Sequence, residues 1–339
     1  MGLERLIGCV GICLLASWAQ AGPPIPADGA IWVQAPASGR QPKFATSAVY
    51  FKDAIYTLSA DGLVNRSEDG LQWEGVSAIT DFNQVPALEV LGDKLVFVKN
   101  RSGTAGAAPA LWSSDDGRIW TSTAITGPQP FYYSPSGAYL LGFSMVNFNG
   151  KLRVFGGGTA GNVQSRTPAE LWSSEDGLTW TQGGTSVGVQ RIYQATTVFN
   201  GRIYTAGGER FPQVGLPVLL HDVWYTEDGE TWTQATDAAE WSARINPGMA
   251  GFNGNLYVAA GSTSDNIAAP KNDVWASADG VNWVQRTNAA SWSPRQGACL
   301  FSLPSRLLIL GGTEASEPAT DHVWYSDVPA SVDTMWLLN

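Results

Sequence analysis

A short hairpin pattern recurs along this chain and limits what the chain can fold into. Within Asp222–Trp232, Val-Trp-Tyr-Thr is a β-branched and aromatic run, Glu-Asp-Gly follows it, and Thr-Trp begins a second extended run. Because Gly accepts the positive φ of a tight turn between strands, the segment predicts a β-hairpin. The complete copies of Ser/Thr-x-Asp-Gly-x-x-Trp are Ser67–Trp73, Ser114–Trp120, Ser174–Trp180, Thr226–Trp232 and Ser277–Trp283.

The spacing of these copies indicates a repeat architecture. Their closing tryptophans stand about 47 to 60 residues apart, which is the length of one four-stranded blade of a β-propeller. A sixth copy is split between the chain ends: Asp321–Ser326 begins the hairpin, and Asp28–Gln34 resembles its second half. We therefore predict that the N-terminal strand completes the last blade, which closes the ring and leaves no terminal sheet edge unpaired.

A second hairpin signal precedes the first within the repeat. Asn-Gly joins two extended runs in Phe148–Gly157, Phe199–Gly208 and Phe252–Gly261. The fold class is accordingly an all-β, six-bladed propeller of four-stranded antiparallel blades. Residues 22–339 are expected to form a single domain, because the repeat overrides the two domains that a length of 339 residues would suggest. The expected blades are about 43–75, 83–123, 139–183, 190–235, 243–286, and 294–327 plus 30–35.

The first 21 residues differ in character from the repeats. Glu4 and Arg5 precede an apolar run, and Ala19-Gln20-Ala21 forms an A-x-A cleavage site, so Met1–Ala21 reads as a signal peptide. Export to the periplasm or the extracellular space is expected, without a membrane span. The mature chain then keeps one cysteine, Cys299, so an intrachain disulfide is impossible.

The net charge of the chain limits the classes of partner that it can bind. The formal net charge is −10, both for the whole chain and after loss of Glu4 and Arg5, which disfavours nucleic acid and anionic membranes. The chain is expected to be a monomer, and its expected partner is a glycan, an anionic sugar or a protein. Neither a cofactor nor a metal site is expected, because His221 and His322 lack the usual ligand spacings. Asn65 and Asn100 begin glycosylation sequons, whose use depends on the host.

The repeated hairpin residues are interpreted as structural. The Asp of each copy is expected to accept hydrogen bonds from nearby backbone N–H groups, and the Trp is expected to pack between blades. The tight turns should share one face of the ring, and the variable loops the opposite face. Ligand binding is therefore expected on the loop face.

Basic residues recur where the innermost strands begin. Nine positions before the first hairpin turn of four blades stand Lys43, Arg191, Arg244 and Arg295. Several cations at the mouth of the central channel could hold a carboxylate or phosphate, although such arginines could instead tie loops to backbone carbonyls. Trp241 and Trp292, each three residues before an Arg, could stack on a sugar or fasten their loops. Glu209 and Arg210 open a long loop near the same mouth, where Glu209 is a candidate general base.

The repeats also resemble a known family. Asn-Gly-x-Leu-Tyr-x-x-Gly-Gly, followed by Asp-Val-Trp and a further Trp, is similar to the kelch repeat of galactose-oxidase-type propellers across the mature chain. The Asp-Gly hairpins resemble sialidase Asp boxes, but they are one residue shorter. Both resemblances imply the fold far more than an activity, because propellers carry enzymes and binding modules alike.

Four functions follow from these features. The favoured one is a binding module for a glycan or a protein on the loop face. The alternative is a sugar-processing enzyme resembling periplasmic sialic acid mutarotases, which implies roles for Glu209 and for arginines 191, 210 and 244. A sialidase is less favoured, because the Arg-Ile-Pro segment expected near the first blade is missing. A galactose-oxidase copper site is rejected, because both histidines lie in predicted hairpin strands and Cys299 is alone.

Overall fold

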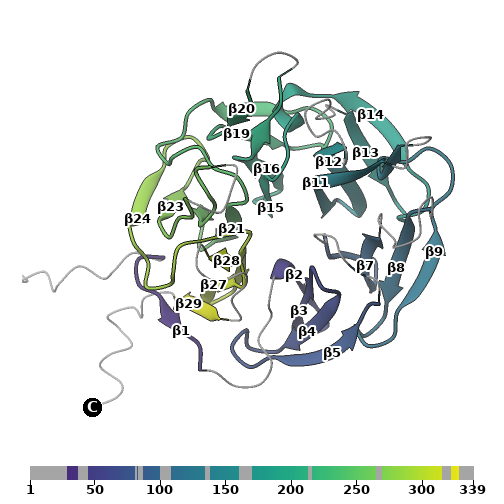
Figure 1. The fold of residues 1–339 in the computed structure, drawn as a ribbon, viewed down its shortest axis with the longest axis horizontal. Coiled ribbons are helices and arrows are strands. Elements are labelled where there is room, and N and C mark those ends of the chain that lie inside the picture. The colour runs from purple at the N-terminus through teal and green to yellow at the C-terminus, as the bar shows by residue number, and fades with distance from the viewer. Residues whose placement is uncertain are drawn as a thin grey trace, which may run out of the picture.

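The protein is a ring of six β-sheets around a central channel (Figure 1). A computed structural model describes residues 29–36, 45–80, 82, 87–99, 108–133, 138–159, 170–212, 216–264, 269–314 and 322–327. Within each blade the strands pair antiparallel, and the first strand of each lies innermost. The predicted all-β, six-bladed propeller is therefore confirmed. No helix in these ranges is long and apolar enough to span a membrane.

The first three blades follow one another along the chain. Blade 1 contains β2 (Ala45–Phe51), β3 (Ala54–Ser59), β4 (Leu63–Ser67) and β5 (Glu74–Ala78). Blade 2 contains β6 (Glu89–Leu91), β7 (Lys94–Lys99), β8 (Ala110–Ser114) and β9 (Thr121–Ala124). Blade 3 contains β11 (Ala138–Phe148), β12 (Lys151–Thr159), β13 (Glu170–Ser174) and β14 (Thr181–Thr185), with the short strand β10 (Tyr132–Tyr133) paired to β11.

The other three blades complete the ring. Blade 4 contains β15 (Ala195–Phe199), β16 (Arg202–Ala206), β19 (Val223–Thr226) and β20 (Thr233–Thr236). Blade 5 contains β21 (Gly248–Phe252), β22 (Asn255–Ala259), β23 (Val274–Ser277) and β24 (Val284–Thr287). Blade 6 contains β26 (Cys299–Leu303), β27 (Arg306–Leu310), β29 (Val323–Asp327) and β1 (Val33–Gln34).

Short elements outside the blades were not predicted. Strands β17 (Glu209–Arg210) and β18 (Val218–Leu219) form one two-stranded sheet, and β25 (Arg295–Gln296) and β28 (Thr313–Glu314) form another. A 3-10 helix, η1, covers Val187–Val189. They lie in loops that connect blade strands, so they shape the loop face.

The N-terminal strand closes the ring as predicted. Strand β1 pairs antiparallel with β29, so the first and last described segments lie side by side (Figure 1). Beside it, Trp32 is 3% exposed and meets Trp292 edge to face, with ring centroids 6.1 Å apart. The Gly29 N–H also donates to the Ser326 hydroxyl at 3.1 Å. Closure therefore combines strand pairing with burial of one large aromatic ring.

The repeated tryptophans pack between blades, in agreement with the sequence interpretation. Trp232 of blade 4 contacts Phe155 of blade 3, with ring centroids 4.9 Å apart. Trp73 of blade 1 belongs to the same apolar cluster as Leu308 and Leu310 of blade 6. Four of the five hairpin tryptophans are buried and Trp120 is half-buried, so the core is divided into interfaces around the ring.

The repeated aspartates organise the hairpin turns. Asp228 Oδ1 accepts hydrogen bonds from the backbone N–H groups of Glu230 and Thr231, each at 2.7 Å, and from the Thr226 hydroxyl at 2.9 Å. Burial acts to raise its pKa, but these hydrogen bonds outweigh it and lower the pKa to about 2. The carboxylate is therefore a structural acceptor in the turn.

We expect Asp228→Ala to destabilise the fold by about 1 kcal/mol, the net value of the hydrogen bonds lost at an exposed turn. Because the folded pKa is depressed, the contribution of Asp228 is present above its ordinary value of 3.8 and is lost as pH falls through about 2. Urea unfolding at pH 7 and pH 2.5 measures it. A deficit of the same size at both pH values would contradict the ionised turn.

Candidate functional site

The central channel forms a cavity among the described residues. It encloses about 640 Å³ and is lined by the innermost strands β2, β6, β11, β15, β21 and β26 together with the residues that lead into them. The volume lies within the range typical of small-molecule sites. Five of these strands form an edge of their sheets, and β11 pairs with β10 only at Ala138 and Tyr139, so backbone N–H and C=O groups also face the channel.

A backbone rim defines the mouth of the channel over blades 3 to 6. Gly142, Tyr193, Asn246 and Gly297 occupy equivalent positions, and all have φ between 50° and 64°. The N–H of Tyr193 donates to Gly142 O, that of Asn246 to Tyr193 O, and that of Gly297 to Asn246 O, at 3.1, 2.8 and 2.9 Å. Positive φ is unfavourable for tyrosine, so the surrounding bonds hold Tyr193 in this conformation.

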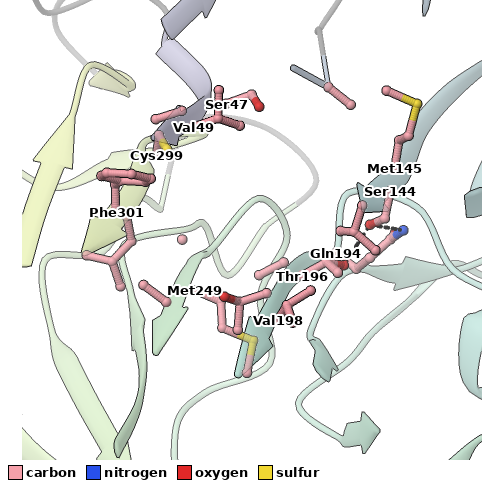
Figure 2. A pocket seen from close by; sticks show the side chains of 18 of the residues that line it. Ser47, Val49, Ser144, Met145, Gln194, Thr196, Val198, Met249, Cys299 and Phe301 are labelled. Atoms are coloured by element: carbon pink, nitrogen blue, oxygen red, sulfur yellow. Dashed lines mark hydrogen bonds between the residues drawn. The ribbon is translucent and has the colours of Figure 1, made fainter. Parts of the chain in front are cut away.

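One wall of the channel is polar (Figure 2). Ser144 on β11 and Thr196 on β15 share a hydroxyl hydrogen bond of 2.7 Å, and Gln194 Nε2 donates to Ser144 Oγ at 2.9 Å. Ser144 is largely buried, whereas Gln194 and Thr196 are half-buried. These side chains form a connected set of donors and acceptors that can engage hydroxyl groups.

The facing wall is mainly apolar. Val49, Cys299 and Phe301 lie across the cavity from the polar group, and Met249 and Val198 lie between the two walls (Figure 2). Burial raises the pKa of the Cys299 thiol to about 12, so this cysteine is a neutral, weakly polar part of the wall. The sequence interpretation placed Cys299 in a buried strand. It is in strand β26, half-buried, at the channel surface.

Glu89 has the one carboxyl side chain among the described residues that line the channel. Burial raises the pKa of its carboxyl to about 8, against the lowering effect of hydrogen bonds from the backbone N–H groups of Asn147 and Val90. Asn147 Nδ2 in turn donates to Val90 O at 2.5 Å. These bonds join β6 to β11 and hold a carboxyl group at the boundary of blades 2 and 3.

The arginines at the starts of the inner strands are fully buried. All five N–H groups of Arg244 have protein acceptors: the two carboxylate oxygens of Asp273 at 2.7 and 2.8 Å, Ala260 O at 2.9 Å, and Ser242 O and Oγ, both at 2.9 Å. Arg191 pairs with Asp222 and Gly207 O in the same way, and Arg295 with Glu314 and Gly311 O. Burial lowers the pKa of Arg295, and Glu314 partly offsets this.

These arginines fasten loops within and between blades. The carbonyl of Arg244 accepts a hydrogen bond from Gly208 N of the preceding blade at 2.8 Å. Gly208 has φ +89°, and a Cβ there would stand 2.5 Å from Ile192 O, which explains the Gly at this position. The ligand role suggested for Arg191, Arg244 and Arg295 stays a prediction, and it would require guanidinium groups that already have protein partners.

The other predicted site residues lie in different settings. Trp241 and Trp292 are each 1% exposed, and their rings lie 5.7 and 5.8 Å from the guanidinium carbons of Arg244 and Arg295. Glu209, on β17, is 4% exposed, whereas Arg210 is exposed. Lys43 lies outside the described residues. The structure thus brings Glu209 and the buried arginines to the loop face, but it does not place them on the channel wall.

The structure also shows the surroundings of His221 and of the Asn65 sequon. His221 Nδ1 lies 3.0 Å from Ala239 O and 3.3 Å from Trp241 O, contacts that Asn272 Nδ2 repeats in blade 5. Over the ranges described, no group of three or more His, Cys, Asp or Glu side chains could hold a metal ion. Asn65 is 1% exposed within β4, so its sequon is buried; Asn100 lies outside the described residues.

Comparisons with known proteins support the fold but identify no family. No family model matches the chain. The solved structure titled "Structure of YjhT" superposes with a TM-score of 0.65 at 14% identity, over 86% of this chain and 96% of that one. The Caenorhabditis elegans spermatocyte protein spe-26 is 27% identical over 173 residues, which are 50% of this chain and 29% of that protein. The match therefore spans less than a third of that relative.

Sequence reasoning missed the channel residues and the partners of the arginines. Asp222 and Asp273 stand two residues before Trp224 and Trp275 in the repeat, and each also accepts a hydrogen bond from that indole at 2.8 Å. The repeated Asp-x-Trp was therefore a usable signal. Ser144, Thr196 and Glu89 could have been found as polar residues on otherwise apolar innermost strands.

Proposed function

We propose that the chain is a carbohydrate-binding propeller that holds a neutral sugar or polyol in its central channel. The observation that carries this proposal is the pairing of the Ser144, Gln194 and Thr196 group with a facing wall of Val49 and Phe301. A sugar has hydroxyl edges and apolar C–H faces, so it needs both kinds of wall. The kelch type of the repeats and export by way of Met1–Ala21 belong to the same proposal.

Charge favours a neutral ligand over an anionic one. The described residues that line the channel include the carboxyl of Glu89 and no cation. Of the four described arginines that the sequence suggested for the site, Arg191, Arg244 and Arg295 are in ion pairs with acidic side chains, and the exposed Arg210 is not among the residues that line the channel. A carboxylate entering the channel would therefore lose water without gaining a cationic partner.

Sugar processing of the mutarotase type is the second candidate. Glu209 exchanges two backbone hydrogen bonds of 2.9 Å with Ile192, which places it one residue from Tyr193 of the rim. Burial raises the pKa of Tyr193, and the charge of Glu209 raises it further. Nuclear magnetic resonance of anomer exchange, with wild type and Glu209→Gln, tests this activity. Equal exchange rates with and without the protein would dismiss it.

A variant with one hydroxyl removed tests the binding proposal. Thr196→Val keeps the side-chain shape but removes a donor and acceptor from the polar wall, so affinity for a neutral monosaccharide should fall about tenfold. Thr121→Val on the exposed strand β9 is the matched control and should bind like wild type. Thermal shift against neutral sugars, sialic acid and glucuronic acid identifies the class of ligand. A shift with acidic sugars alone, or with none, would refute the neutral-sugar site.

A further inference from the structure

We infer that Glu89 selects amine-bearing sugars, so that the channel prefers an amino sugar to the corresponding neutral sugar. This inference rests on the proposed function and names the ligand class of the same site. It starts from geometry: Glu89 lies on β6 and lines the channel, and the side-chain amide of Asn147 on β11 donates to the carbonyl of the neighbouring Val90 at 2.5 Å. A carboxylate can accept about four hydrogen bonds, so this group can bind a donor on a ligand.

No neighbouring cation competes for Glu89 among the described residues of the strands packed against β6. Strand β2 carries Tyr50, and β11 carries Tyr139 and no charged residue. Strand β7 carries Lys94 and Lys99, but Lys94 Nζ donates to Asp115 Oδ1 at 2.7 Å and Lys99 Nζ to Thr80 O at 2.9 Å. An ammonium group on a ligand would therefore supply a counter-charge that these strands do not provide.

The polar wall and Glu89 give the ligand two points of attachment. Both belong to the cavity lining, and both lie at β11: Ser144 is on this strand, and Asn147 of the same strand bonds the carbonyl of Val90, next to Glu89. Hydroxyl groups would meet the Ser144, Gln194 and Thr196 group, and an ammonium would meet the Glu89 carboxyl. A neutral sugar can use only the first attachment strongly, because its hydroxyl makes a weaker hydrogen bond than an ammonium does to a carboxylate.

Binding of an ammonium must displace a proton from Glu89 at neutral pH. Burial raises the pKa of Glu89 to about 8, so the carboxyl is protonated at pH 6.5. A bound cation favours the ionised carboxylate, and the proton leaves to buffer. Affinity for an amino sugar should therefore be linked to release of one proton per site, whereas affinity for a neutral sugar should not.

Isothermal titration calorimetry at pH 6.5 tests the inference with glucosamine and glucose as probes. In wild type, glucosamine should bind about fivefold more tightly than glucose, because a charge-assisted hydrogen bond in this site outweighs the cost of ionising Glu89 at pH 6.5. Titrations in two buffers of different ionisation enthalpy should show release of one proton with glucosamine only. Glu89→Gln should remove the preference and the proton release. Glu68→Gln, which changes a side chain that is 72% exposed on the outside of blade 1, is the matched control.

The possible failures are distinguishable. Equal affinity of wild type for the two sugars would overturn the amine preference and leave the neutral-sugar proposal standing. A preference that survives in Glu89→Gln would overturn the role of Glu89. Absence of binding by both sugars, with circular dichroism showing a folded protein, would overturn the inference and the proposed function together.

Discussion

Replacing Arg244 by methionine is expected to destabilise the propeller by about 3–5 kcal/mol, the cost of breaking a buried ion pair from one side. The Asp273 carboxylate would lose two hydrogen bonds at 2.7 and 2.8 Å in a site where its side chain is only 14% exposed. The Ala260 carbonyl would lose its donor as well. Methionine fills much of the space, so the loss is electrostatic and not chiefly a cavity.

Urea or guanidinium unfolding of wild type and Arg244→Met measures this cost. Arg210→Met is the matched control, because Arg210 is exposed on β17, and it should change stability by less than about 0.5 kcal/mol. Adding Asp273→Asn to Arg244→Met should recover part of the loss, since the uncompensated buried charge is then removed. A loss below about 1 kcal/mol for Arg244→Met would show that the ion pair does not fasten these loops.

The fold was predictable because every copy of the repeat uses the same local interactions. Each Asp-Gly hairpin needs the same turn acceptor and buries the same tryptophan, so copies such as Thr226–Trp232 identify a blade without knowledge of tertiary contacts. The split sixth copy also predicted the pairing of β1 with β29. Agreement among several copies removes the ambiguity that a single hairpin would leave.

The candidate site was much less predictable, because it depends on deviations from the repeat. The arginines stood out in the sequence because they recur. They recur because three blades share one structural hydrogen bond: Arg191, Arg244 and Arg295 each donate to the carbonyl 16 residues later. The polar residues of the channel occur at different positions in each blade. Only the ring geometry brings Ser144 and Thr196 together across a blade boundary.

Replacing Glu89 by glutamine is expected to stabilise the protein near pH 8 and to have little effect near pH 4. Burial raises the pKa of the folded carboxyl from the ordinary value of 4.5 to about 8. Between these pH values the folded protein holds a proton that the unfolded chain has released, so the contribution of Glu89 to stability falls as pH rises. Over this pH range the loss in free energy of unfolding is at most about 5 kcal/mol, at 1.36 kcal/mol per pKa unit.

Glutamine is neutral at every pH and can still accept the N–H bonds from Val90 and Asn147. The stability difference between Glu89→Gln and wild type should therefore grow from pH 4.5 to pH 8 and then level off, because both states of the wild type are ionised above that point. Guanidinium unfolding at half-unit steps from pH 4 to pH 9 measures it, with Glu68→Gln as the exposed control. A flat difference across this range would mean that the channel leaves the carboxyl well hydrated, and Glu89 would then hold no proton for an amino sugar to displace.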